Sequence, residues 1–292
     1  MSTIVRFLVC IFLFPVSVIA QSSLPSERTI GHIEPVFKFL DSMPAGVTVS
    51  RQGRIFVNFP RWGDHVPFTV AEIRDGKLIP FPNANINRAD ESRPSDTLIS
   101  VQSVVVDAKD RLWILDTASP SFRPPISGGA KLIAIDLVTN QVVKTIVFPP
   151  SAVLPTTYVN DVRFDLRIGK EGVAYVTDSS LHGPGAILVV DLSSGKVLRR
   201  LSGHSSTSPD KTFVPMVEGE TWILRKLNHA PVPLTVAADG IALSADGATL
   251  YYCPLSSRHL YSIPTAALRD DSISEKELGN KVVDLGEKGA SD

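Results

Sequence analysis

Four stretches of the sequence repeat one pattern, an apolar strand, a polar turn and a second strand rich in aromatic residues. They read GVTVSRQGRIFVNF (46–59), SVVVDAKDRLWILD (103–116), DVRFDLRIGKEGVAYVTD (161–178) and GIALSADGATLYYC (240–253). The equivalent turn positions are Ser50, Asp107, Asp165 and Ser244. Repetition of one pattern along the chain indicates a fold built from copies of one small unit.

Two further strands are expected after each of these pairs. The runs are 67–73 and 77–81, 131–137 and 141–148, 186–192 and 196–201, and 259–264 and 281–286. Four antiparallel strands per unit, repeated along the chain, are typical of a β-propeller. The sequence therefore predicts an all-β fold, with four-stranded blades at about 46–81, 101–148, 160–201 and 240–286.

The ring of blades is expected to be incomplete. The stretch HIEPVFKFL (32–40) resembles an additional strand that has no partner in its own unit. The sequence ends at Asp292, which corresponds to the residues that open the fourth blade, so the chain is expected to be truncated before blade five. A closed four-bladed ring is the alternative, and the unpaired strand and the wide blades argue against it.

The first twenty residues have the pattern of a secretory signal peptide. Arg6 precedes the apolar run 7–14, and Val18-Ile19-Ala20 suits a signal peptidase. We therefore expect cleavage after Ala20, a propeller domain over residues 21–292, an extracellular or periplasmic protein, and no membrane association after cleavage. Cys253 is then the one remaining cysteine, so no internal disulfide is expected, and its apolar surroundings indicate a buried strand residue.

Composition and missing motifs exclude several classes of function. The chain has 29 Lys and Arg against 30 Asp and Glu, which gives no reason to expect a nucleic-acid partner. A hydrophobic content of 43% excludes a disordered chain. The sequence contains no G-x-S-x-G, no H-E-x-x-H and no glycine-rich phosphate loop, so an acyl-enzyme hydrolase is not expected. The oligomeric state is left open.

The residues that start the inner strand of each blade are the first candidates for a site. Such residues face the mouth of the central tunnel, where ligands bind in closed β architectures. They are Gln102, Asn160, Asp161, Asp239 and Asp292. Carboxylate and amide oxygens in this arrangement suit Ca²⁺ or another divalent cation. The alternative is that Asp161 and Asp239 cap turns or accept backbone hydrogen bonds between blades.

A long insertion before the fourth blade is the second candidate. Residues 213–235 could cross the mouth of the tunnel and offer Trp222, Arg225, Asn228 and His229 to a ligand. A surface loop is the alternative for the insertion, and a solvated histidine is the alternative for His229. Two other tryptophans receive structural interpretations: Trp62, with Arg61, at a blade corner, and Trp113 in the core between blades.

Several motifs resemble the major royal jelly protein/yellow family. They are NFPRWG (58–63) followed by Val66 and Thr69, Ser100-Val101-Gln102-Ser103, LWILDT (112–117), AYVTDSS (174–180), Gly203-His204-Ser205-Ser206 and residues 239–261. The resemblance covers nearly the whole chain after residue 20. It implies a secreted six-bladed propeller with a tunnel that binds small molecules, because known relatives bind biogenic amines or take part in pigment chemistry. A small polar or aromatic ligand is therefore expected.

A more distant resemblance is to the gluconolactonase/regucalcin propellers. In that group, acidic and amide residues at the openings of the inner strands hold one divalent ion, and the matching positions here are Asn160, Asp239 and Asp292. The group's first-blade glutamate is absent, because the corresponding residues are Met43-Pro44-Ala45-Gly46. A metal-dependent lactonase-type hydrolase is therefore the alternative function, with a metal site that lacks one expected carboxylate.

Overall fold

The computed structural model describes residues 31–225 and 230–288, and the chain divides into two compact units, residues 1–38 and 39–292. The stretch 31–40 contains no strand, so the strand expected at 32–40 is wrong. Its apolar side chains Ile33, Val36 and Leu40 are 87%, 75% and 81% exposed. An extended segment becomes a strand only where its backbone pairs with another strand, and no described strand pairs with this one.

Four antiparallel sheets of four strands each make up the second unit and confirm the predicted β-propeller blades. Blade 1 contains β1 (Gly46–Val49), β2 (Ile55–Asn58), β3 (Val70–Arg74) and β4 (Lys77–Pro80). Blade 2 contains β5 (Val101–Val106), β6 (Arg111–Asp116), β7 (Lys131–Asp136) and β8 (Gln141–Val147). Blade 3 contains β9 (Val159–Asp165), β10 (Val173–Asp178), β11 (Ala186–Asp191) and β12 (Val197–Arg200). Blade 4 contains β17 (Ala238–Leu243), β18 (Thr249–Pro254), β19 (His259–Pro264) and β20 (Val283–Glu287).

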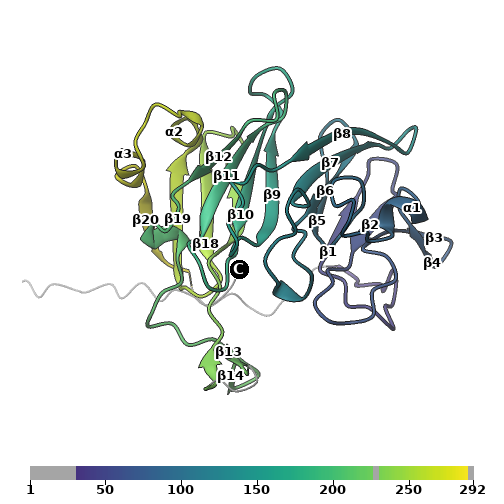
Figure 1. Cartoon of the computed structure of the whole chain (residues 1–292), viewed down its shortest axis with the longest axis horizontal. Helices are drawn as coiled ribbons and strands as arrows, with labels where there is room; N and C mark the ends of the chain where they lie inside the picture. Colours follow the sequence, from purple (N-terminus) through teal and green to yellow (C-terminus); the bar gives the residue numbers. More distant parts are fainter. Residues whose placement is uncertain (1–30, 226–229, 289–292) are drawn as a thin grey trace, which may run out of the picture. The chain divides into compact units, whose positions relative to one another are not determined.

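The blades follow one another in chain order around the body of the protein (Figure 1). The innermost strands are neighbours in the same order, β1 beside β5, β5 beside β9 and β9 beside β17. Within the described residues the four sheets do not close into a ring, so this is an incomplete propeller. The inner strands all face the same central space, which places their side chains together.

Three apolar cores lie between successive blades and follow from strand alternation, because neighbouring side chains of a strand point to opposite faces. In β6, Leu112 and Ile114 pack toward blade 1, whereas Trp113 and Leu115 pack toward blade 3. The aromatic residues at the same strand position in blades 1, 2 and 3 fill successive cores and are all fully buried. They are Phe56, Trp113 and Tyr175. The expectation that Trp113 lies between blades is confirmed.

The four equivalent turn residues have one role, which is to bind backbone N–H groups of the turn that joins the first two strands. Ser50 Oγ accepts from Arg54 N at 3.1 Å, and Ser244 Oγ accepts from Thr249 N at 3.0 Å. Asp107 Oδ1 accepts from Lys109 N at 2.8 Å, and Asp165 accepts from the backbone of the residue two positions later. Short side chains with oxygen acceptors stabilise tight turns in this way.

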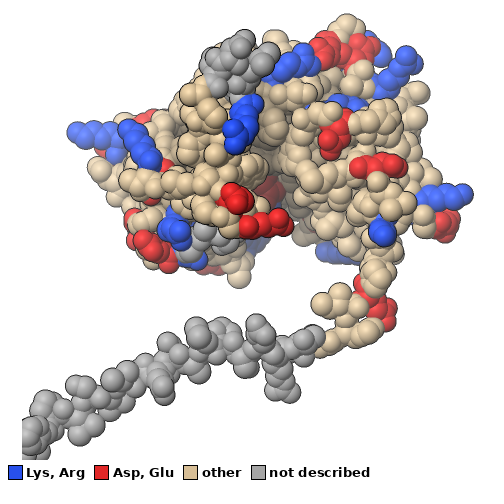
Figure 2. Space-filling model, turned by 90° about the horizontal axis from the view of Figure 1, so that it is seen from below, with Lys and Arg blue, Asp and Glu red and all other residues tan. Residues whose placement is uncertain are grey.

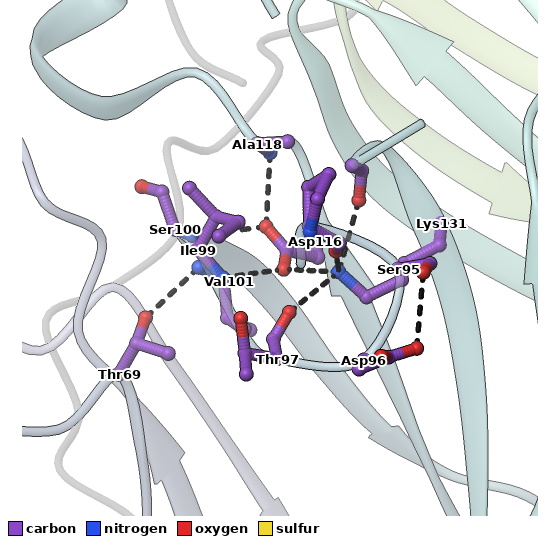
Figure 3. Close-up of polar contacts among 12 residues, drawn as sticks. Thr69, Ser95, Asp96, Thr97, Ile99, Ser100, Val101, Asp116, Ala118 and Lys131 are labelled. Atoms are coloured by element: carbon purple, nitrogen blue, oxygen red, sulfur yellow. Dashed lines mark hydrogen bonds and ion pairs between the residues drawn. The ribbon is translucent and has the colours of Figure 1, made fainter. Parts of the chain in front are cut away.

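Blade 2 also contains a buried ion pair between neighbouring strands (Figure 3). Lys131, the first residue of β7, stands directly opposite Asp116, the last residue of β6. Lys131 Nζ lies 2.8 Å from Asp116 Oδ2, and both side chains are 0% exposed. Three backbone carbonyls complete the shell around Nζ, and three backbone N–H groups, of Ile99, Ser100 and Ala118, donate to the carboxylate. A buried pair with this many partners is structural.

The remaining elements are short. The helices are α1 (Ala84–Asn87), α2 (Thr265–Arg269), α3 (Glu275–Gly279) and two 3₁₀ turns, Pro120–Phe122 and Ser205–Thr207. The insertion before blade 4 forms two small ribbons, β13 (Met216–Val217) with β14 (Glu220–Thr221) and β15 (Ile223–Leu224) with β16 (Val232–Pro233). Among the described helices, none has the length and apolar character needed to span a membrane.

Candidate functional site

A cavity of about 1270 Å³ opens between the inner strands of the four blades. Residues of β1, β5, β9 and β17 line it, because the inner strands face the same central space. On the face of the protein drawn in Figure 2, basic and acidic side chains are interspersed, without a broad surface of one sign. A concave site with mixed apolar and polar walls is the usual form of a small-molecule site. The polar lining side chains include Gln102, Asn160, Asp161, Arg163, Ser179, Asp239 and Lys288.

Asn160 and Asp239, from the starts of β9 and β17, are brought together as the sequence predicts. Asn160 Nδ2 donates to Asp239 Oδ1. Ser179, directly after β10, donates to the same carboxylate oxygen at 2.6 Å. Thr177 Oγ1 accepts from the Asp161 backbone N–H at 3.2 Å and donates to the Asp239 carbonyl at 3.0 Å. These contacts join the starts of the inner strands of blades 3 and 4. They place the Asp239 carboxylate and the Asn160 amide on the cavity wall.

Asp161 has a different environment from Asp239, although both start inner strands. Its carboxylate pairs with Arg163 at 2.8 Å, accepts from Ser103 Oγ at 3.0 Å, and accepts from the Val162 backbone N–H at 2.8 Å. Both of its oxygens therefore have partners within the protein. The structural alternative, a hydrogen-bonded carboxylate between blades, describes Asp161 well, and Asp161 also lines the cavity.

An aromatic wall of three side chains borders the same cavity. Trp62 stacks on Phe122 with ring centroids 5.9 Å apart, and Phe122 lies 5.2 Å from Tyr158. Trp62 Nε1 donates to the Tyr158 hydroxyl at 2.7 Å, and the hydroxyl donates to Gln102 Oε1 at 2.7 Å. Burial raises the pKa of Tyr158 well above the usual range of a phenol, so the hydroxyl keeps its proton. The wall offers flat apolar surface with one polar end at Gln102.

The chain reaches this arrangement through loops of two blades. Arg61 fixes the corner after β2, because its guanidinium donates to Ile99 O at 2.9 Å and its backbone N–H donates to Ser100 Oγ at 3.0 Å. This agrees with the corner role expected for Arg61. Trp62 is also stacked and hydrogen-bonded, as expected for a corner residue, and in addition it lines the cavity. Phe122 belongs to the loop between β6 and β7, where Ser121 and Phe122 have φ of 54° and 55°.

The insertion contributes one wall, as expected for part of its length. Trp222, Ile223, Leu224 and Leu234 line the cavity. Trp222 is 49% exposed, so much of its ring is open to solvent. Arg225 is exposed and is not among the lining residues. Asn228 and His229 lie outside the described residues, so their proposed ligand contacts stay predictions.

The structure gives partial geometry for the expected metal site. Asn160 and Asp239 are adjacent, whereas Asp292 lies outside the described residues. Within the described ranges, no three His, Cys, Asp or Glu residues cluster as metal ligands do. In addition, Asn160 turns its amide nitrogen, not its oxygen, toward Asp239. One carboxylate and one amide fall short of the six to eight oxygens that Ca²⁺ prefers, so these described residues alone do not fit a calcium ion.

Cys253 and Lys288 lie on the blade 4 side of the cavity. Cys253 is 3% exposed, in agreement with the buried strand position expected for it. Burial raises the pKa of the Cys253 thiol, and the nearby Lys288 ammonium opposes that shift. A protonated, buried thiol is a packing residue and a poor nucleophile.

Three of the site residues escape prediction from the sequence. Trp62 falls within the NFPRWG motif but has the features of a corner residue, and Phe122 and Tyr158 lie in loops without a distinctive pattern. Trp62 and Tyr158 are 96 positions apart. Only the folding of blades 1, 2 and 3 against one another brings them together, and no local signal could have revealed their contact.

Comparison with known proteins gives one family match and several relatives. The family model described as major royal jelly protein matches residues 99–292. Protein yellow of Drosophila guanche is 27% identical over 268 residues, which cover 85% of this chain and 44% of that protein. Protein yellow of Drosophila melanogaster is 26% identical over the same length, which covers 46% of it. The chain thus spans less than half the length of these curated relatives.

Solved structures show weaker likenesses. The hydrazine synthase of Kuenenia stuttgartiensis is 16% identical, with a TM-score of 0.47, over 81% of this chain and 57% of that one. Regucalcin of Agrobacterium tumefaciens, a calcium-binding protein, is 13% identical, with a TM-score of 0.41, over 85% of this chain and 59% of that one. At these levels of similarity, no residue role carries over from either protein.

Proposed function

Because the chain belongs to the major royal jelly protein family, we propose that it is a secreted, yellow-like β-propeller whose cavity binds a small aromatic molecule with polar groups. Secretion is part of the proposal and is supported by the signal-peptide pattern of residues 1–20. Those residues lie outside the described part of the chain. Detection of Gln21 as the first residue of exported protein would test this part.

The observation that carries the binding proposal is the aromatic wall of Trp62, Phe122 and Tyr158. It lies in the same cavity as a polar floor, formed by Gln102, Asn160 and Asp239. Phe122 is 46% exposed although it is a large apolar side chain in a folded protein. An aromatic ring that is stacked on one side and open on the other offers a surface for a second ring. Trp222 adds a half-exposed indole to the cavity lining.

The polar floor supports a ligand with hydrogen-bonding groups. Asn160, Asp239 and Gln102 present amide and carboxylate atoms within the same cavity. Arg163 and Lys288 add positive charge to it, so the lining carries both signs. A few polar groups on an otherwise apolar wall orient a ligand without requiring that it be an ion.

Calorimetric titration with soluble aromatic probes tests the proposal. We expect 4-ethylphenol and 4-hydroxyacetophenone to bind the wild-type protein. Phe122→Ala should weaken both by about three- to tenfold, because a stacked aromatic contact contributes about 0.5–1.5 kcal/mol beyond its buried area. Unfolding temperature should change little, since nearly half of the Phe122 surface is exposed.

Phe213→Ala is the matched control. The Arg258 guanidinium lies over the Phe213 ring, with its carbon 5.9 Å from the ring centroid. Phe213 is not among the residues that line the cavity. Its replacement should leave probe binding unchanged. If neither probe bound the wild-type protein, or if the two variants weakened binding equally, the proposed site would be wrong.

A metal-dependent, lactonase-type hydrolase is the second candidate, and one observation favours it. Asn160 and Asp239 are adjacent at the openings of neighbouring inner strands. Two further measurements separate the candidates. One is calorimetric titration with Ca²⁺, and the other is an assay of lactone hydrolysis with and without a chelator. Chelator-sensitive hydrolysis that Asp239→Ala abolishes would favour the hydrolase, whereas probe binding without hydrolysis would favour the binding protein.

A further inference from the structure

The hydrogen bonds on the aromatic wall run in one direction, which the chemistry of their members fixes. Trp62 Nε1, Tyr158 Oη and Gln102 Oε1 are joined in sequence by two contacts of 2.7 Å. An indole N–H can only donate a hydrogen bond. The Tyr158 oxygen therefore accepts from Trp62, and its single proton is available for Gln102.

Burial removes the alternative in which the Tyr158 proton points elsewhere. Tyr158 is 6% exposed, and a buried hydroxyl without an acceptor is costly. Gln102 Oε1 is the acceptor that the structure provides. Because burial also raises the pKa of Tyr158, the hydroxyl stays protonated and this donation persists across physiological pH.

The orientation of the Gln102 amide follows from this chain. Its oxygen is engaged by Tyr158, so its Nε2 group, with two N–H bonds, remains to donate. Gln102 lines the cavity. Among the residues that the structure describes, none accepts a hydrogen bond from Nε2. A donor that is held in place but has no acceptor is suited to bind an acceptor on a ligand.

We propose that Gln102 determines ligand specificity by donating from Nε2 to a carbonyl or carboxylate oxygen of an aromatic ligand, and that Tyr158 and Trp62 are positioning residues that fix its amide. The inference rests on the proposed function and adds to it the functional group that the ligand presents. The ring of such a ligand lies along Phe122, which stacks on Trp62 and contacts Tyr158. The same side chains therefore hold the ring and orient the donor.

A matched pair of probes tests the donor. 4-Hydroxyacetophenone and 4-ethylphenol share a phenol ring and have similar size, but only the first has a carbonyl group. We expect the wild-type protein to bind the ketone about three- to tenfold more tightly, the size expected for one net hydrogen bond. Gln102→Leu should reduce this ratio to about one. Gln102→Glu, which has nearly the same shape, should reduce it to one or below because a carboxylate accepts and does not donate.

A second variant tests the positioning role. Tyr158→Phe keeps the ring but removes the proton that holds Gln102 Oε1, so the ratio should fall toward one while the affinity for 4-ethylphenol changes less than about twofold. If Tyr158 only packed against the ligand, both affinities and their ratio would stay unchanged, because the ring is retained. The Gln102 side-chain amide resonances in ¹⁵N-labelled protein give a direct readout, since they should shift with the ketone and not with 4-ethylphenol.

Gln141→Glu is the control for the charge change, because Gln141 is exposed on β8 and lies outside the cavity lining. It should preserve the wild-type ratio. Equal affinities of the wild-type protein for the two probes, or a ratio preserved in Gln102→Glu, would overturn the inference and leave the proposed function standing. Failure of both probes to bind would overturn both.

Discussion

Blades 2 and 3 use the same device in two different ways. In both, the last residue of the second strand is a buried aspartate, Asp116 in β6 and Asp178 in β10, with side chains 0% exposed. Blade 2 pairs Asp116 with Lys131 from the adjacent strand. Blade 3 pairs Asp178 with Arg199 at 2.8 Å, and Arg199 belongs to β12, two strands away.

The difference in reach explains the difference in cation. Neighbouring strands lie about 4.8 Å apart, so a lysine opposite an aspartate can contact it directly, whereas a cation two strands away needs the longer guanidinium. Arg199 also donates to Ala152 O at 3.0 Å and to Pro184 O at 2.6 Å. Asp178 in turn accepts from the Tyr158 backbone N–H at 2.8 Å. Both pairs also hold the loop before the inner strand of their blade, Asp116 through the N–H groups of Ile99 and Ser100 and Asp178 through that of Tyr158. In blade 3 this loop carries Tyr158 to the cavity.

Removal of the blade 2 cation should have the largest effect on stability. Lys131→Met leaves Asp116 buried without its counter-ion and leaves three carbonyls without a donor. We expect the free energy of unfolding to fall by about 3–5 kcal/mol, the usual cost of breaking a buried ion pair. Urea denaturation measures this. Lys196→Met, which breaks an exposed pair with Asp271, should change the free energy of unfolding little. Equal losses would mean that the Lys131 pair contributes no more than a surface pair.

Removal of the blade 3 cation should have a smaller effect that depends on pH. Arg199→Met should lower the free energy of unfolding by about 3 kcal/mol at pH 7, the lower end of the usual cost of breaking a buried ion pair. Burial already raises the pKa of Asp178, and Arg199 opposes that shift. Without Arg199 the folded-state pKa rises further above the unfolded one, so the penalty should be smaller below that pKa and grow as pH rises through it. Urea denaturation at pH 5 and pH 7 tests this, and a penalty that is larger at pH 5 would contradict it.

Loss of the blade 4 ion pair should have the smallest effect on stability, because the pair is exposed. His259 Nδ1 lies 2.9 Å from Asp284 Oδ2 and joins β19 to β20. The hydrogen bond with Asp284 raises the pKa of His259, and Asp284→Asn should return it toward the ordinary value. The pair's contribution to stability is fully present below the unfolded-state pKa of His259 and is lost as pH rises through the raised folded-state value. Titration of the His259 ring protons by NMR measures the shift, and an unchanged pKa in the variant would exclude the pair as its cause.

Much of the propeller could be predicted because each blade is encoded locally. The alternation of apolar residues is visible within single runs such as LWILD. Each turn residue binds a backbone N–H two to five positions later in the chain, as seen for Ser50, Asp107, Asp165 and Ser244. The strand expected at 32–40 was wrong because a strand also depends on a partner elsewhere in the chain. Alternating apolar residues indicate a strand only where a partner strand exists, and local sequence does not supply that information.

The candidate site was only partly predictable, because it depends on contacts between distant residues. Asn160 and Asp239 could be predicted from the repeat, since equivalent positions of neighbouring blades lie side by side. Trp62, Phe122 and Tyr158 could not, because their arrangement depends on loop conformations and on the packing of three blades. Repeats predict which equivalent positions meet, whereas the features that distinguish one blade from another lie in the connections.

The three tryptophans occupy three different depths, which gives the protein a built-in set of optical reporters. Trp113 is 0% exposed and stacked on Phe164, Trp62 lies on the cavity wall with its N–H engaged by Tyr158, and Trp222 is 49% exposed. Their fluorescence should therefore combine emission from a dry core, from the ligand cavity and from a solvated ring. Replacing one indole at a time would separate signals of global unfolding from signals of events confined to the cavity.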